Sequence, residues 1–141
     1  MVDTLHFRAV VPSQYRLRAA VNVTVHPNLK SLAAEFKLVK AAGSSSKGLQ
    51  GFATTYEIRS PTGRKLPLLG EIHLTRSTCT IDVIVHEVMH VVFAWLRYKP
   101  ERLALLCDPN QSDAEEDVCY VLGGLAANVV RQLLKNDIKV L

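Results

Sequence analysis

The sequence contains no apolar run that approaches the 18 uninterrupted residues of a transmembrane helix, so we expect no membrane span. The first residues, Met1–His6, lack the basic and apolar regions of a secretory signal. Cysteine is scarce, and Cys79, Cys107 and Cys119 show no paired spacing. These absences predict reduced thiols and a cytoplasmic location. We expect Cys79 and Cys119 to be small buried apolar residues rather than metal ligands.

The composition is that of one globular domain, 1–141. Of the 141 residues, 48% are hydrophobic and 21% are charged, and this length can bury a real core. Residues 1–65 carry ten Lys and Arg against three Asp and Glu, whereas residues 66–141 carry seven against ten. The basic half offers a surface for nucleic acid or an acidic protein. Its charges are spread out and not interleaved with aromatic residues, so a solvated surface is the favoured interpretation.

Hydrophobic periodicity predicts an α+β fold, in which a small and mostly antiparallel sheet packs on a central helix and on a long helix that follows it. The expected strands are Leu5–Val11, Tyr15–Val25, Phe52–Arg59 and Lys65–Thr75, with a turn at 61–63 between the last two. The expected helices begin after Asn28, at Ile81, and at Ser112 or Asp113; the second reaches about Tyr98 and the third about Lys135. Residues 43–48 and the segment after Pro100 are expected to be a loop and a linker.

The helix at 81–98 is apolar almost all round, which is typical of a helix in the middle of a domain. It contains His86-Glu87-Val88-Met89-His90, the H-E-x-x-H pattern of zinc metalloproteases. Histidines four residues apart lie on one helix face, so both imidazoles can bind one metal ion. Glu87 lies about 100° around the helix from His86, close enough to hold a metal-bound water. Burying three polar groups here is costly unless each has a partner, and a metal with its water would satisfy all three.

A catalytic zinc usually takes three protein ligands, so a third ligand is expected from elsewhere in the chain. The acidic cluster 113–117 opens the last long helix, about 25 residues after His90. Glu115 heads the helix face that looks like the core stripe, whereas Glu116 heads a face of small residues that would let two helices approach closely. We therefore favour Glu116 over Glu115 as the third ligand. Acidic residues also favour the positive end of a helix, so the cluster alone carries little weight.

The remaining histidines are weaker candidates. His73 lies in the strand before the H-E-x-x-H helix, and a side chain in that strand could face a cleft. His6 and His26 lie near strand or turn ends. For each we favour a packing or partly exposed surface role.

These residues resemble the zincin metallopeptidases, and among them the small single-domain gluzincin-like proteins of bacteria and phages. The likeness covers His86, Glu87 and His90, and then the stretch from Glu116 to Tyr120 followed by Gly123. The resemblance implies zinc bound by His86, His90 and Glu116, with Glu87 as the general base. It also implies a sheet whose edge strand, here expected at 70–75, lies along the cleft and pairs with an extended substrate.

Three functions remain open at this point. The favoured one is a zinc-dependent peptidase acting on a peptide or protein substrate, in which Glu87 accepts the proton of the attacking water. Tyr120, His73 and Arg76 are unranked candidates for stabilising the oxyanion. The second is a zincin-like binding module for nucleic acid or protein, with a structural or vestigial metal. The third is a metal hydrolase that acts on another bond.

Overall fold

The computed structural model describes residues 3–11, 19–39, 48–56, 68–98, 100–110 and 112–141. Parts of several predicted segments lie outside the described residues: 15–18, 43–47, 57–59 and 65–67, together with the turn at 61–63. The described chain is an α+β domain of one sheet and four helices.

Four strands form a single mixed sheet in the order β1-β2-β4-β3. They are β1 (Leu5–Val10), β2 (Ala20–His26), β3 (Phe52–Thr55) and β4 (Leu68–Thr75). The β1–β2 and β3–β4 pairs are antiparallel, and the central β2–β4 pair is parallel. The predicted hairpin pairing of β3 with β4 is therefore confirmed, and most of the pairings are antiparallel as expected.

Three of the helices match the prediction. They are α1 (Leu29–Val39), α2 (Ile81–Tyr98) and α4 (Ser112–Lys135). The short helix α3 (Pro100–Leu106) occupies the segment expected to be a linker, because the fixed φ of proline suits the first turn of a helix as well as it ends the preceding one. In the part of the chain that the structure describes, no helix has the length and apolar character needed to cross a bilayer.

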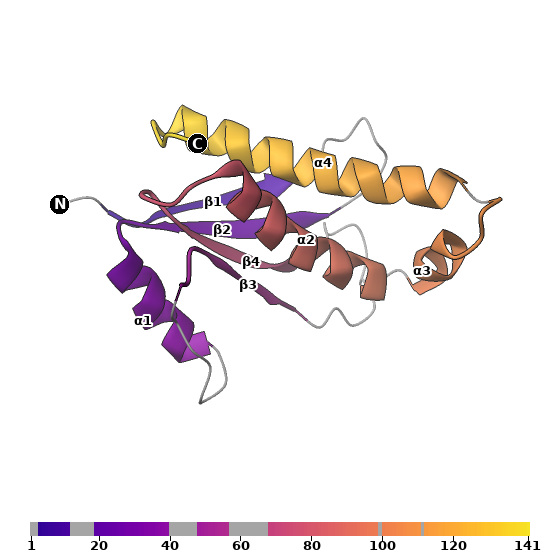
Figure 1. The fold of residues 1–141 in the computed structure, drawn as a ribbon, viewed down its shortest axis with the longest axis horizontal. Helices are drawn as coiled ribbons and strands as arrows, with labels where there is room; N and C mark the ends of the chain where they lie inside the picture. The colour runs from indigo at the N-terminus through magenta and orange to yellow at the C-terminus, as the bar shows by residue number, and fades with distance from the viewer. Residues whose placement is uncertain (1–2, 12–18, 40–47, 57–67, 99, 111) are drawn as a thin grey trace.

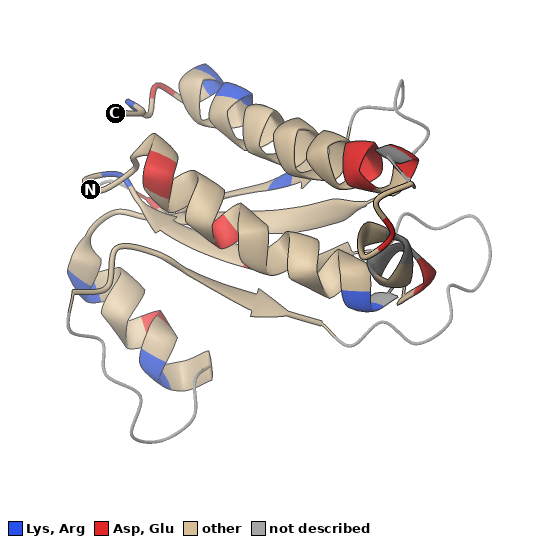
Figure 2. Cartoon of the chain, turned by 45° about the vertical axis from the view of Figure 1, so that its right-hand side comes forward, with Lys and Arg blue, Asp and Glu red and all other residues tan. Residues whose placement is uncertain are grey.

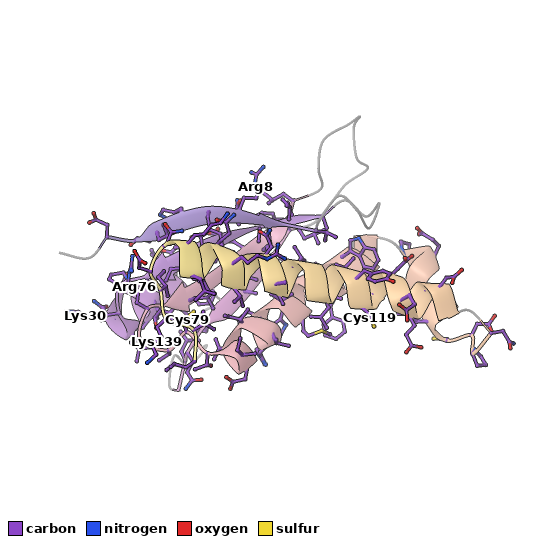
Figure 3. All side chains as sticks on the ribbon, turned by 90° about the horizontal axis from the view of Figure 1, so that it is seen from above. Arg8, Lys30, Arg76, Cys79, Cys119 and Lys139 are labelled. Atoms are coloured by element: carbon purple, nitrogen blue, oxygen red, sulfur yellow. The ribbon has the colours of Figure 1, made fainter. Side chains whose placement is uncertain are left out.

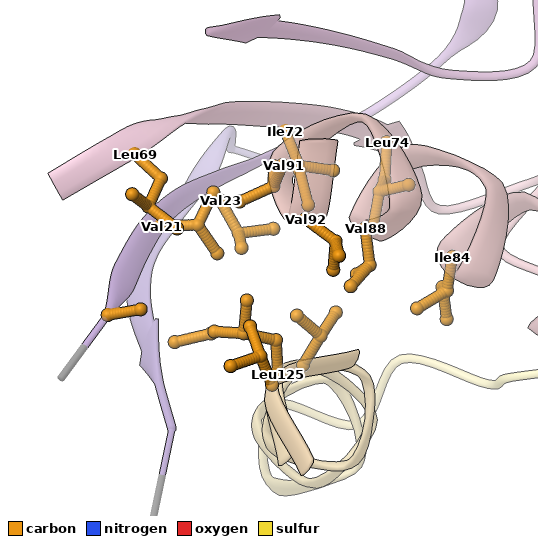
Figure 4. Close-up of a cluster of buried hydrophobic side chains, with 14 of the residues drawn as sticks. Val21, Val23, Leu69, Ile72, Leu74, Ile84, Val88, Val91, Val92 and Leu125 are labelled. Carbon is orange, nitrogen blue, oxygen red and sulfur yellow. The ribbon is translucent and has the colours of Figure 1, made fainter. Parts of the chain in front are cut away.

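The helices cover both faces of the sheet. α2 and α4 lie side by side on one face, with α4 over β1 and β2 and α2 over β3 and β4 (Figure 1). Their shared core contains fully buried aliphatic side chains from β1, β2, β4, α2 and α4, among them Val23, Leu74, Val88, Val92 and Leu125 (Figure 4). On the other face, α1 packs through Leu32 and Phe36 against Phe52.

The sheet order decides which strand borders a site on α2. β4 pairs with β2 on one side and β3 on the other, so it is an interior strand. The expectation that 70–75 forms the edge beside the cleft is therefore wrong. β3 is the edge strand on the α2 side, because the chain folds back after β3 and inserts β4 between β3 and β2.

Candidate metal centre

The structure brings the residues of the H-E-x-x-H pattern together. His86, Glu87 and His90 each offer one ligand atom, and these atoms all lie within 4.8 Å of one another. The two imidazole rings meet edge to face, with centroids 5.1 Å apart and planes at 77°. Two nitrogen donors and one carboxylate are a donor set that suits zinc, whose ligands lie about 2.0–2.2 Å from the ion.

The three side chains differ in their exposure to solvent. His86 and His90 are exposed, whereas Glu87 is only 5% exposed. α2 also exposes Ile81 and Phe93, so the expectation that this helix lies in the middle of the domain and not on its surface is wrong for this face. The burial cost expected for three polar groups therefore applies to Glu87 alone. The imidazoles face the solvent and the carboxylate lies beneath them.

The close approach of β3 to α2 explains why Glu87 is buried. Gly51, immediately before β3, lies so near α2 that a Cβ atom there would be 3.1 Å from Val83 Cγ1 and 3.4 Å from Glu87 Cγ. The same Cβ would lie 3.0 Å from the backbone oxygen of His73. The absence of a side chain at this position lets the backbone cover the stem of Glu87.

Two adjoining hollows make an open groove over the candidate centre. Their volumes are about 430 and 400 Å³, and Gly51, His86 and Glu87 line both. The first extends past residues 48–50 to Asp82. The second extends along β3 and α2 and is lined by the following additional residues: Phe36, Phe52, Ala53, Thr55, His90, Phe93 and Arg97. The groove therefore follows the edge strand and passes over all three groups of the centre.

The structure does not bring Glu116 or Glu115 to the two histidines. Among the described residues, the one group of three potential metal ligands is His86, Glu87 and His90. Both glutamates of α4 are exposed. The first turns of α4 lie beside α3, at the end of α2 that is distant from its first turn, and carry the acidic cluster (Figure 2). The third-ligand prediction for Glu116 thus has no support from the geometry.

The orientation of both helices explains this difference. α2 packs on α4 through Val88 and Val92, which point toward Leu125 (Figure 4). His90 is two residues from both valines, which places it about 200° around the helix from each, on the opposite side of α2. The small-residue face of α4 that favoured Glu116 also points to solvent, because Cys119 and Tyr120 are exposed. The core stripe predicted below Glu115 is the face that packs.

The cysteines divide between two environments. Cys79 is buried, as expected, and burial raises the pKa of its thiol to about 11. Cys119 is exposed on α4, so the expectation that it is buried is wrong (Figure 3). None of the three cysteines is in a disulfide, and none lines the groove.

The three candidates for oxyanion stabilisation also lie away from the groove. His73 is buried on the α1 face of the sheet, and neither Tyr120 nor Arg76 lines either hollow. Arg97, which the sequence interpretation did not single out, is the groove residue with a cationic side chain among those described. The sequence could have indicated this residue, because a position seven residues after His90 lies on the same face of the helix.

A second polar cluster occupies the opposite face of the sheet. His26 Nε2 lies 2.9 Å from His73 Nδ1, and His73 Nε2 lies 3.4 Å from Glu71 Oε1. Thr24 donates to the same Glu71 oxygen at 2.8 Å, and Ser31 Oγ lies 3.0 Å from His26 Nδ1. Phe52 stacks on the His73 ring at 4.3 Å between centroids. The packing role expected for His73 and His26 is therefore confirmed, and the sequence did not reveal that they form a network.

This network predicts that the protein becomes less stable as the pH falls below neutrality. Burial lowers the pKa of His26 and of His73, although the carboxylates Glu71 and Glu35 partly oppose the shift. Between the lowered folded-state pKa and the ordinary value near 6.5, the unfolded chain binds more protons, so the free energy of unfolding falls with falling pH. We expect a lower urea midpoint at pH 5.5 than at pH 7.5.

The matched variant for this measurement is His73→Gln, which removes one titrating ring from the network. Its urea midpoint should change less between the two pH values than that of the wild type. An unchanged wild-type midpoint would contradict the prediction.

No family model, curated protein or solved structure matches this chain. The resemblance to zincins thus depends on the H-E-x-x-H residues themselves, and the family assignment stays a prediction.

Proposed function

We propose that this protein is a zinc-dependent peptidase. The observation that carries the proposal is the convergence of two imidazoles and a buried carboxylate in a groove that runs along the edge strand β3. The zincin resemblance implies the same combination of groups. Three cysteines without a disulfide are consistent with a reducing, cytoplasmic setting for the reaction.

The donor set fits a zinc ion, with His86 and His90 as the ligands. When bound, zinc would polarise the scissile carbonyl and lower the pKa of a coordinated water to near 7. Zinc tolerates open coordination positions in catalytic sites, so an exposed pair of imidazoles suits a centre that must admit substrate. A third protein ligand is not assigned.

Glu87 has the position of a general base. Its carboxylate shares the groove with the two imidazoles and is shielded from bulk water. It would accept a proton from the attacking water and later donate that proton to the leaving amine. β3 would hold the substrate, because an extended peptide can add as a further strand along the outer side of a sheet, and β3 is the last strand in the order β1-β2-β4-β3.

The zinc content of matched variants tests the proposed metal ligands. We expect about one zinc ion per chain in the wild type after dialysis, and a large loss in His90→Ala, because one imidazole alone binds weakly. Glu116→Ala should retain the wild-type content, since the structure keeps this side chain away from the histidines. Metal analysis of the purified proteins measures all three values.

His6→Ala is the control, because His6 is an exposed histidine of β1 that hydrogen-bonds Thr24. It should retain zinc. Zinc loss in Glu116→Ala would show that α4 supplies a ligand after all. Equal zinc in His90→Ala and the wild type would remove the proposed centre, and a binding module or a metal-independent function would then be preferred.

A further inference from the structure

One stripe of α2 joins the candidate centre to groups of opposite charge at its two ends. Asp82, His86, His90, Phe93 and Arg97 recur every three or four residues, and all five are exposed and line the groove. The acidic first turn and the basic last turn of the helix are visible in Figure 2. An extended ligand lying along this stripe would therefore meet a negative charge near one end and a positive charge near the other.

Arg97 lacks a strong partner within the described part of the chain. Its Nη2 atom donates one long hydrogen bond, 3.4 Å, to the hydroxyl of Thr55 at the end of β3. No described carboxylate lies within ion-pair distance of it. A guanidinium presents a planar set of N–H donors that matches a carboxylate in two parallel hydrogen bonds. The groove thus ends in an exposed guanidinium that pairs with no carboxylate among the described residues.

A cation in the last turn of a helix also interacts favourably with the helix dipole, and this accounts for a basic residue near this position. It does not account for the direction of the side chain. Arg97 reaches across to Thr55 of β3 and lines the same hollow as His90 and Glu87. The guanidinium therefore lies over the groove that the proposed substrate would occupy.

We propose that Arg97 determines substrate specificity by binding a carboxylate of the peptide, about three residues from the bond that is cleaved. Seven residues of helix separate His90 from Arg97, a rise of about 10 Å, and an extended peptide covers about 3.3 Å per residue. The carboxylate belongs either to an Asp or Glu side chain or to the peptide C-terminus. This inference rests on the proposed peptidase function.

The test compares peptides that differ by one charge. A bond that the zinc-loaded wild type cleaves is first found in a mixed peptide library. Matched peptides then carry Glu or Gln at each position near that bond, with the C-terminus either free or amidated. At one position, about three residues from the bond, we expect kcat/KM to be about 10- to 100-fold higher for the charged form. An effect in a Glu/Gln pair would show that Arg97 binds a side-chain carboxylate, and an effect in a free/amidated pair would show that it binds the C-terminus.

Variants then assign the preference to Arg97. Arg97→Gln should cleave the charged and neutral peptides at nearly equal rates. The effects of changing Arg97 and of removing the peptide charge are therefore not additive. Arg8→Gln is the matched control, because Arg8 donates to the amide oxygen of Asn22 and projects from β1 away from the helices (Figure 3). It should keep the full preference. If Arg97→Gln does not fold, Arg97→Lys keeps the charge but loses the paired hydrogen bonds, and its preference should fall several-fold.

Three results would overturn the inference. The first is equal cleavage of both members of every peptide pair by the wild type. The second is a wild-type preference for the charged peptide in Arg97→Gln. Both results would leave the peptidase function standing. A wild type that binds zinc and cleaves no peptide would instead reject the peptidase function, and the specificity assigned to Arg97 would be rejected with it.

Discussion

Replacing Glu87 with glutamine is expected to lower the rate of peptide hydrolysis by about 10²- to 10⁴-fold, the usual contribution of a general base. Glutamine has nearly the same shape as glutamate, so it can occupy the same buried position beside Gly51. It cannot accept a proton from the attacking water. Since His86 and His90 remain, the zinc content should stay at the wild-type level.

The rate and the zinc content of Glu87→Gln must be measured on the same preparation. Loss of both would indicate that Glu87 is itself a metal ligand, which its distance to the imidazoles would allow. Glu115→Gln is the control for the loss of one negative charge, because Glu115 is exposed on α4. Unchanged hydrolysis by Glu87→Gln would remove the assigned role.

The second large effect is expected from Gly70→Ala, which should lower the free energy of unfolding by about 3 kcal/mol, at the upper end of the usual cost of overpacking. Gly70 of β4 pairs with Thr55 of β3, and an added Cβ would collide with the backbone oxygen of Thr54. A backbone oxygen in a paired strand cannot move aside as a flexible side chain can. β3 would have to separate from β4, and the groove would lose one wall.

Gly123→Ala is the matched control, since Gly123 lies within α4 and a Cβ there would meet no atom within 4 Å. Alanine is the better helix former, so this variant should gain about 0.5–1 kcal/mol. Urea denaturation of both variants gives the comparison. Equal stability of Gly70→Ala and the wild type would contradict the close approach of the β3 backbone to Gly70.

The first residues of α1 and α2 were predictable because short-range hydrogen bonds determine where these helices begin. Asn28 Oδ1 accepts a hydrogen bond from the backbone N–H of Ser31, and Thr80 Oγ1 accepts one from Val83 at 3.4 Å. Both contacts are N-caps, which depend on residues only three positions apart. The starts of α1 and α2 could therefore be predicted from these residues and from the periodicity that follows them.

The order of the strands was not predictable in the same way. β2 and β4 pair in parallel although 41 residues separate their ends, and no local signal in either strand records that pairing. The prediction of 70–75 as the edge strand failed for this reason. The alternating pattern of β4 predicts a strand, but it does not indicate whether that strand is at the edge or in the interior of the sheet.

The rotation of α4 limited the prediction of the site. His86, Glu87 and His90 share one helix, so their proximity follows from helical geometry alone. A ligand from α4 depends on which face of that helix meets α2, and both a small-residue face and a core stripe were available. The larger apolar stripe, with Leu125 and Val129, packs because it buries more surface, and Glu116 is left in solvent.

The central claim is that His86 and His90 hold one metal ion with Glu87 beside it. Anomalous diffraction at the zinc absorption edge, from crystals of the zinc-loaded wild type, tests it most directly. We predict a peak about 2.0–2.1 Å from one ring nitrogen of each histidine, at the base of the groove. A zinc-loaded crystal with no peak between these two rings, or with its peak elsewhere on the molecule, would contradict the proposed centre.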